Sequence, residues 1–205
     1  MTPTNLIFFS LGALLGSIPS GVLVSKLPGG VDPRNTGSGN IGATNVFRTS
    51  GVTRGAITLM GDILKGSIAV AMVSIFAGAS AESLYLQGLA AVGAVLGHMY
   101  SPFLGFQGGK GVATGLGAFF YLMPGPVAWA IIVFAAVVSL TRYVSLGSIL
   151  GVMTMPVAGI FFGYTLKLIV ISSLAACLII WRHKSNIQRL LRGEENRIGQ
   201  RKNRT

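Results

Sequence analysis

The chain has 205 residues, of which 51% are hydrophobic and 10% are charged, and its mean hydropathy is +0.68. A soluble domain carries about 25% charged residues, so this composition excludes a water-soluble globular protein. It predicts an all-α integral membrane protein with a single domain over residues 1–205. The net charge of +11 indicates basic loops and contact with anionic membrane lipids, and we do not expect nucleic acid as a partner.

Seven apolar runs follow one another along the chain and predict about seven transmembrane helices. Pro and Gly between the runs end one helix and begin the next, as in Met123–Pro126. No Lys or Arg precedes Lys26, so we expect the first run to stay in the protein rather than act as a cleaved signal peptide. The runs are Asn5–Leu27, Ala56–Ala79, Leu84–Tyr100, Gly111–Met123, Pro126–Leu140, Ser145–Phe162 and Thr165–Trp181.

The distribution of Lys and Arg predicts the orientation. With seven spans and the N-terminus outside, fifteen of the sixteen lie in inside segments or at the inner ends of the adjoining spans, and only Lys167 lies outside. Basic loops stay in the cytoplasm, so the C-terminus is expected there, and a five-span arrangement that merges short runs keeps this orientation. The predicted cytoplasmic segments are loops 28–55, 101–111 and 141–145, which would carry the active site, and a basic tail at 182–205.

The first of these loops contains the segment GSGNIGATNVFR, residues 37–48. Its glycines let backbone N–H groups approach an anion closely, and Arg48 adds a planar fork suited to phosphate. The alternative is an ordinary polar loop, but the density of donors and the lack of any acid favour an anion site. Its candidate ligand-binding residues are Ser38, Gly39, Asn40, Thr44, Asn45 and Arg48.

Two polar features lie inside the predicted spans. Asp62 and Lys65 are three residues apart in the second span, where a charge costs about 2.5–3.5 kcal/mol. Residues at this spacing share a helix face, so we predict a structural ion pair, with contact to the site as the alternative. His98 ends the third span, and both a structural and a functional role are open for it.

The segment FLGFQGGKGVATGLG, residues 103–117, carries a lysine among glycines. It is not a Walker loop, because Leu104 and Gly111 stand where a glycine and a hydroxyl are required, nor a dinucleotide loop, because Thr114 replaces the last glycine. What remains is a lysine before a helix N-terminus, which favours phosphate; the alternative is a lysine that snorkels at the membrane boundary. The candidate residues are Gly108, Gly109, Lys110, Gly111 and Thr114.

The helix that follows this loop is short for a membrane span. Its run of 13 residues spans roughly 20 Å at 1.5 Å per residue, whereas the hydrocarbon core is about 30 Å thick. Non-helical backbone at membrane depth is tolerated where it is buried in protein or lines a wet cavity. We therefore expect the glycine loop to line a cavity.

Two further polar stretches fall on the same side. Arg142, Ser145 and Ser148 surround the start of the sixth run, and His183 and Asn186 follow the seventh. Cations on both sides of His183 favour its neutral form, which leaves a ring nitrogen free to orient a hydroxyl or to accept a proton.

Acids are scarce on this side of the chain. The cytoplasmic loops hold one, Asp32, before Glu194 and Glu195 in the tail, so the sequence predicts no metal cluster and no pair of catalytic carboxylates. Such a site binds more than one phosphate and supplies little base, which suits a substrate that is already activated.

Taken together, these motifs resemble the bacterial acyl-phosphate:glycerol-3-phosphate acyltransferases, the PlsY family. The likeness runs in order from Gly16 to Gly199 and includes GSIPSG (16–21), DILKG (62–66) and Gly97-His98 beside the segments above. It ends with TRYVSLGS (141–148) and RHKSNIQRLLRGEE (182–195). Gln107 stands where the family has lysine and Glu194 where it has threonine.

The resemblance implies transfer of a fatty acyl group from acyl phosphate to the 1-hydroxyl of glycerol 3-phosphate, the first acylation in phospholipid synthesis. It implies no cofactor, a monomer, and a site facing the cytoplasm from a bacterial inner membrane. The histidine and aspartate five residues apart of other glycerolipid acyltransferases are absent here, because Phe103 and Gln188 stand at that spacing after the two histidines.

The expected site residues divide by role. Catalysis is assigned to Ser38, Ser145, Ser148, His183 and Asn186, and the base is either His183 or a phosphate oxygen of the donor. Binding of the phosphates and glycerol is assigned to Gly39, Asn40, Thr44, Asn45, Arg48, Gly108, Gly109, Lys110, Gly111, Thr114 and Arg142, with no metal.

A transporter of a phosphorylated or anionic small molecule is the main alternative, because glycine-broken helices also mark transport sites. Against it, the outer half of the predicted bundle offers only Glu82 and Lys167. Another lipid enzyme, an alcohol phosphotransferase, would need several aspartates, and the chain has only Asp32 and Asp62.

Overall fold

A computed structural model describes residues 2–78 and 80–199, and all regular secondary structure in these ranges is helical. Helix ends follow local sequence: Thr2 caps α1 by accepting from the N–H of Asn5, and Pro124 stands in the first turn of α7, where its missing N–H costs nothing. The helices are α1 (Pro3–Gly16), α2 (Ser20–Ser25), α3 (Ala43–Ser50), α4 (Val52–Ala77), α5 (Ala81–Met99), the 3-10 turn η1 (Pro102–Leu104), α6 (Val112–Leu122), α7 (Pro124–Thr141), α8 (Val144–Phe161), α9 (Leu166–Arg182) and α10 (Lys184–Leu191).

The predicted apolar runs reappear as helices, with one correction. The first run is not continuous, because the chain leaves the helix at residues 17–19 and divides it into α1 and α2. Pro19 lies at this break, and proline cannot continue the backbone hydrogen bonds of a helix. The predicted polar loop also contains a short helix, α3.

Four helical segments within the described residues are long and apolar enough to cross a membrane: residues 3–25, 52–77, 124–141 and 144–161. A fifth is added if α9 and α10, which meet at a bend of 58°, count as one span. Buried polar side chains in α5, such as Gln87 and His98, make that helix less apolar. The 11 residues of α6 cover only about 17 Å, so the number seven stays a prediction.

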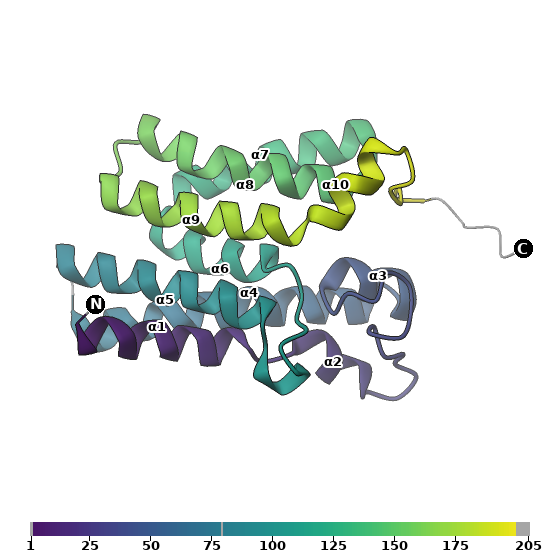
Figure 1. Cartoon of the computed structure of the whole chain (residues 1–205), viewed down its shortest axis with the longest axis horizontal. Helices are drawn as coiled ribbons and strands as arrows, with labels where there is room; N and C mark the ends of the chain where they lie inside the picture. The colour runs from purple at the N-terminus through teal and green to yellow at the C-terminus, as the bar shows by residue number, and fades with distance from the viewer. Residues whose placement is uncertain (1, 79, 200–205) are drawn as a thin grey trace, which may run out of the picture.

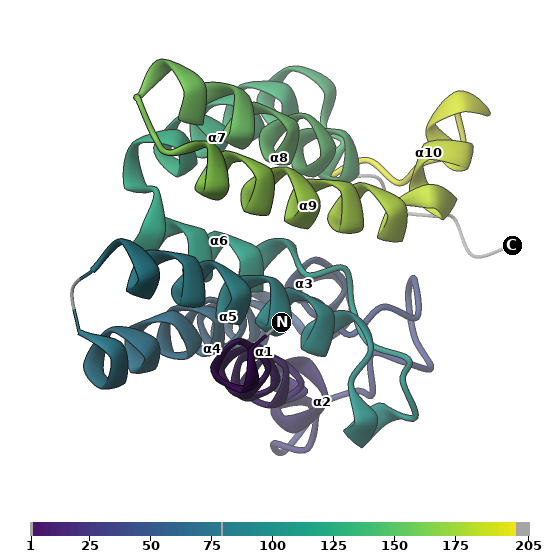
Figure 2. The same ribbon diagram turned by 60° about the vertical axis from the view of Figure 1, so that its left-hand side comes forward.

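The helices form two layers (Figures 1 and 2). One layer holds α1, α4 and α5, the other holds α7, α8 and α9, and α6 lies between them. The core between the layers includes Phe119 of α6, Val127 of α7 and Met155 of α8. Figure 1 shows α2, α3, the loop before α6, the α7–α8 turn and α10 at one end of the molecule, which we call the basic end.

Close contact between α4 and α6 positions the start of α6 at the basic end. A Cβ atom at Gly66 would lie 2.1 Å from the carbonyl oxygen of Thr114, and one at Gly117 would lie 2.0 Å from that of Ile63. Only glycine permits backbones to approach this closely. The loop that precedes α6 is therefore held beside the polar residues of α4.

Candidate active site

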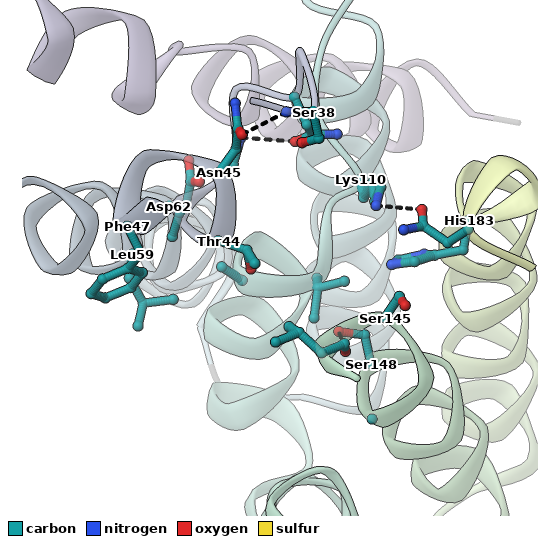
Figure 3. A pocket seen from close by; sticks show the side chains of 18 of the residues that line it. Ser38, Thr44, Asn45, Phe47, Leu59, Asp62, Lys110, Ser145, Ser148 and His183 are labelled. Atoms are coloured by element: carbon teal, nitrogen blue, oxygen red, sulfur yellow. Dashed lines mark hydrogen bonds between the residues drawn. The ribbon is translucent and has the colours of Figure 1, made fainter. Parts of the chain in front are cut away.

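One large cavity, of about 1760 Å³, lies between the two layers. At the basic end it is polar, and Figure 3 shows Ser38, Lys110, Ser145 and His183 arranged around it from different helices and loops. Deeper in the molecule it continues as an apolar groove between α6, α7 and α8. The groove is lined by Leu116, Phe119, Val127, Ile131, Phe134 and Met155.

The glycine loop presents Lys110 to this cavity. The N–H groups of Gly108 and Gly109 donate to the carbonyl oxygens of Met99 and His98, both at 3.0 Å. The guanidinium of Arg182 binds the carbonyl oxygens of the same two glycines at 2.9 and 3.1 Å. The loop is thus tied to the ends of α5 and α9.

The amino group of Lys110 is buried among other cations. Its Nζ donates to Oδ1 of Asn186 at 2.5 Å. Burial lowers the pKa of Lys110 to about 8; Glu195 opposes this shift, and the nearby arginines, among them Arg189 and Arg48, add to it. A phosphate group bound beside Lys110 would supply negative charge to balance this ammonium group.

Glu195 lines the cavity, although the sequence did not predict it as a site residue. Its Oε1 accepts from Ser145 Oγ at 2.9 Å and from Asn186 Nδ2 at 2.7 Å, and its Oε2 accepts from Arg189 Nε at 2.7 Å. Burial would raise the pKa of Glu195, but these hydrogen bonds outweigh burial and leave it below its usual value. The sequence feature that could have indicated this residue is the presence of two adjacent acids, Glu194 and Glu195, within an otherwise basic tail.

The first part of the tail folds back over the α7–α8 turn. The N–H of Ile198 donates to the carbonyl oxygen of Arg142, and Arg197 Nε donates to the hydroxyl of Tyr143, both at 2.9 Å. This path brings Glu195 to the lining of the cavity. The tail prediction beyond residue 199 lies outside the described residues.

His183 lies between α9 and α10, outside both helices, and its side chain is 2% exposed. Its Nδ1 is 2.8 Å from the carbonyl oxygen of Ile179. A carbonyl only accepts hydrogen bonds, so Nδ1 carries a proton and the neutral ring keeps its lone pair on Nε2. His183 lines the cavity together with Ser148, whose Oγ donates to the carbonyl oxygen of Val144 at 2.9 Å.

The segment 37–48 divides into supporting and cavity-facing residues. Asn45 Oδ1 accepts from the N–H of Ser38 at 2.9 Å, and its Nδ2 donates to the carbonyl oxygens of Pro33 and Thr36 at 2.9 and 3.0 Å. Its polar atoms are thus engaged in folding the loop, and Asn45 also lines the cavity. Three other residues of this segment line the cavity with exposed side chains: Ser38, Thr44 and Arg48. Asn40 also lines it, and its Oδ1 accepts from the N–H of Gly42 at 2.8 Å.

The structure places five other expected binding residues away from the large cavity. Thr114 is fully buried, and its Oγ1 lies 3.2 Å from His98 Nδ1. Arg142 is exposed and ends α7 in a left-handed conformation, with φ of 63°. Gly109 acts through the hydrogen bonds that hold its loop. Gly39 and Gly108 line a separate cavity of about 520 Å³ with Arg34 and Arg182. None of these five residues is among those that line the large cavity.

The structure also tests the ion pair predicted inside α4. Lys65 Nζ lies 2.8 Å from Asp62 Oδ1, and both side chains are buried, so the predicted pair is confirmed. In residues 2–78 and 80–199, no group of three or more His, Cys, Asp and Glu side chains gathers as metal ligands.

We expect Glu195→Gln to lower the unfolding temperature in detergent, because three hydrogen bonds lose their charged acceptor. A hydrogen bond to a charged group contributes about 1.5–3 kcal/mol, which corresponds to roughly 3–12 °C in a chain of this size. The pKa of Glu195 is lower in the folded protein than in the unfolded chain. Its contribution to the stability of the fold is therefore present above the unfolded pKa and is lost as the pH falls through the folded pKa. The exposed neighbour provides the control: Glu194→Gln should change neither the melting temperature nor its acid dependence, and equal effects would contradict this role.

Comparisons with known proteins agree with this geometry. The family model for glycerol-3-phosphate acyltransferase matches residues 6–193. Among the most similar relatives, the glycerol-3-phosphate acyltransferase of Endomicrobium trichonymphae is 44% identical, over 95% of this chain and 96% of the relative. That of Geobacter sulfurreducens is 45% identical, over 95% and 97%.

Solved structures extend the likeness to the fold. Crystal structures of PlsY, an integral membrane glycerol 3-phosphate acyltransferase, superpose with TM-scores of 0.87 for the glycerol 3-phosphate form and 0.86 for the lysophosphatidic acid form. They are 38% and 37% identical to this chain and cover 95% of it, and the match includes 96% and 95% of their own chains. With sequence, fold and a phosphate-suited cavity in agreement, this chain belongs to the glycerol-3-phosphate acyltransferase family of integral membrane proteins.

Proposed function

We propose that the protein transfers a fatty acyl group from acyl phosphate to the 1-hydroxyl of glycerol 3-phosphate and so begins phospholipid synthesis. One observation carries this proposal: a single cavity joins a cationic end, around Lys110, to an apolar groove between α6, α7 and α8. An acyl phosphate has a charged head and an apolar tail that match these two parts, and glycerol 3-phosphate brings a second phosphate to the charged part.

The charged end suits two phosphates. Lys110 and Arg48 supply positive charge, and the N-terminus of α6, where Gly111 and Val112 line the cavity, adds backbone N–H groups and about half a unit of positive charge. Ser38 in the facing loop and Thr44 at the start of α3 add neutral hydroxyl donors.

The reaction would be a direct displacement. The 1-hydroxyl oxygen attacks the carbonyl carbon of the acyl phosphate, an ester bond forms, and the bond from that carbon to the phosphate oxygen breaks. Inorganic phosphate leaves, and the hydroxyl proton passes to a phosphate oxygen or to Nε2 of His183. Negative charge grows on the carbonyl oxygen in the transition state, and one preorganised donor there contributes about 2.7–4 kcal/mol. The first-turn N–H groups of α6 are the donors that we assign to this task.

The groove is assigned to the acyl chain. At its inner end are Phe119, Val127 and Met155, which are each less than 10% exposed and belong to the protein core. A transporter needs polar groups on both sides of the membrane, whereas the deep part of this cavity is apolar. This lining favours the enzyme over the transport alternative.

We further propose a bacterial inner membrane protein with seven spans, an outside N-terminus and a cytoplasmic active site, which works as a monomer. Support comes from the position of the basic loops, because α3, the Lys110 loop and α10 all lie at the basic end (Figure 1). The positive-inside rule assigns such an end to the cytoplasm.

The test is a donor comparison with purified protein in lipid vesicles. Labelled glycerol 3-phosphate is incubated with either palmitoyl phosphate or palmitoyl-CoA, without added metal. We expect labelled lysophosphatidate from palmitoyl phosphate alone. Product from palmitoyl-CoA would overturn the choice of donor, and no product from either would overturn the proposed function.

A further inference from the structure

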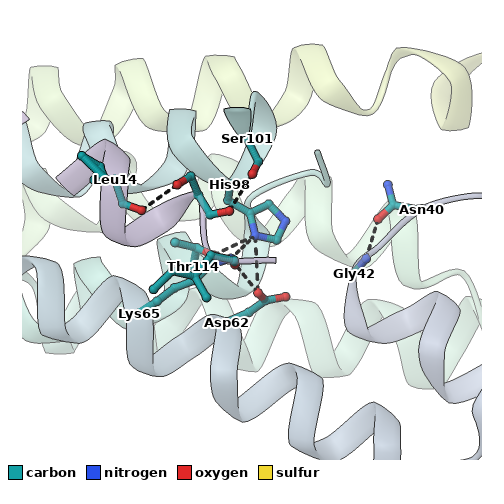
Figure 4. Close-up of polar contacts among 10 residues, drawn as sticks. Leu14, Asn40, Gly42, Asp62, Lys65, His98, Ser101 and Thr114 are labelled. Atoms are coloured by element: carbon teal, nitrogen blue, oxygen red, sulfur yellow. Dashed lines mark hydrogen bonds and ion pairs between the residues drawn. The ribbon is translucent and has the colours of Figure 1, made fainter. Parts of the chain in front are cut away.

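His98 is a buried histidine that the proposed reaction leaves without a role. It lies in the last turn of α5, is 3% exposed, and lines the cavity with Lys110 and Gly111. Figure 4 shows its ring packed beside Asp62, Lys65 and Thr114, with one ring nitrogen facing these residues and the other turned away from them.

The contacts on the first side determine where the ring carries its proton. Lys65 Nζ lies 2.8 Å from each of three acceptors: Asp62 Oδ1, the carbonyl oxygen of Ile18, and His98 Nδ1. An ammonium group has donors and no acceptor, so Nδ1 must accept in its contact with Lys65. The neutral ring therefore carries its hydrogen on Nε2.

The Nε2–H group points at the phosphate loop. A Cβ atom at Gly109 would lie 2.2 Å from Nε2, and the N–H of Gly109 donates to the carbonyl oxygen of His98 at 3.0 Å. Within residues 2–78 and 80–199, no hydrogen-bond acceptor is assigned to Nε2. A ligand bound in the cavity that His98 lines can therefore serve as the acceptor.

We propose that His98 binds substrate directly, and that its Nε2–H donates to a phosphate oxygen held beside Lys110 and the first turn of α6. Lys65 and Asp62 are then positioning residues, because they hold Nδ1 as an acceptor and so keep the hydrogen on Nε2. The inference rests on the proposed function, since the ligand is the phosphate group of glycerol 3-phosphate or of acyl phosphate.

The electrostatics of the cluster suit this role. Asp62 and Lys65 together carry no net charge, so they orient the ring without changing the charge of the site. A histidine that only supports the fold needs no vacant donor on the side of the cavity. A glycine at position 109 leaves room for a ligand atom to reach Nε2, whereas any side chain there would collide with the ring.

Two substitutions separate binding from structural support. The amide of Gln reaches the place of the imidazole Nε2, whereas the amide of Asn reaches only that of Nδ1. We expect His98→Asn to raise the KM for one of the two substrates by about 10- to 100-fold, the loss of one hydrogen bond to a charged group. His98→Gln should stay within about fivefold of wild type, since it keeps the donor. The substrate whose KM rises identifies the phosphate.

Thermal unfolding of both variants provides the control. The proposal is overturned if His98→Asn leaves kcat and both KM values within twofold of wild type, or if both variants lose activity alike and melt at lower temperature. A wild-type enzyme that makes no product would instead contradict the proposed function.

A measurement on the wild-type protein avoids any failure of the variants to fold. The chain has only two histidines, so ¹⁵N-histidine labelling gives two ring systems, and His183→Gln assigns them. We expect the Nε2–H signal of His98 to shift when glycerol 3-phosphate or a non-hydrolysable acyl phosphonate saturates the site. No shift with either compound would overturn the proposal.

Discussion

Lys110→Met is expected to lower kcat/KM by about 10²- to 10³-fold, the loss associated with one preorganised donor to a developing or bound oxyanion. The variant keeps most of the length of the side chain and removes its charge. Lys110 donates to Asn186 Oδ1 at 2.5 Å, so it also holds in place a residue that binds Glu195. Initial rates at varied concentrations of each substrate will show which phosphate the ammonium binds.

The pH dependence of the same residue gives a second expected result. Because the pKa of Lys110 is lowered to about 8, the free enzyme loses this charge, and with it the phosphate site, as pH rises through 8. We therefore expect kcat/KM to fall tenfold per pH unit above that value, since kcat/KM reports the free enzyme. The second pKa of a phosphate monoester is about 6, so the substrate stays dianionic across this range.

Two variants control this experiment. Lys110→Arg keeps a charge that is not lost below about pH 12, and should move the basic limb out of the measured range. Lys184 is exposed and stacks on Trp181. The variant Lys184→Met removes the same charge as Lys110→Met, and its pH profile should match that of the wild type. A basic limb near pH 8 that persists in Lys110→Arg would contradict the assignment.

His183→Ala is expected to lower kcat by about 10²-fold or more, in the range that a positioned acid–base or orienting group contributes. The side chain is buried, lines the cavity, and keeps its Nε2 lone pair free because Nδ1 is bonded to Ile179. In the proposed reaction, this free Nε2 is available to the hydroxyl group that must lose a proton.

A second variant separates orientation from proton transfer. Burial and the charge on Lys110 lower the pKa of His183 to about 4, so the imidazole is a weak base at neutral pH. We therefore expect the donor phosphate to take the proton and His183 to orient the hydroxyl. His183→Gln retains a hydrogen-bonding group but cannot accept a proton, and should keep activity within about tenfold of wild type. A loss equal to that of His183→Ala would make His183 the base.

Much of the architecture could be predicted from the sequence, because hydropathy is a local property. The run Pro126–Leu140 became α7 with its ends shifted by one or two residues. The run Gly111–Met123 became α6, still short for a span. The family could also be predicted, since its motifs are short segments read in order. The prediction of one continuous first helix was wrong, because the apolar pattern continues across Pro19, where the helix breaks.

Part of the site was readable for the same reason. Lys110 beside Gly111, at the start of a helix, indicates a phosphate site without knowledge of the fold. Ser38 and Arg48 were identified by the density of donors around them. In each case the chemistry lies within a few consecutive residues, and the structure places these residues at one cavity.

Only the tertiary structure decided what depends on contacts between distant segments. Glu195 meets Ser145 across 50 positions, and Lys65 meets His98 across 33; no local pattern distinguishes such an acid or histidine from a solvated one. Other contacts engage Asn45 with the backbone of its own loop and bury Thr114 beside His98. Residue type and spacing determined which groups can bind phosphate, whereas the packing of α4, α5 and α6 determined which of them face the ligand, because burial and direction exist only once helices meet.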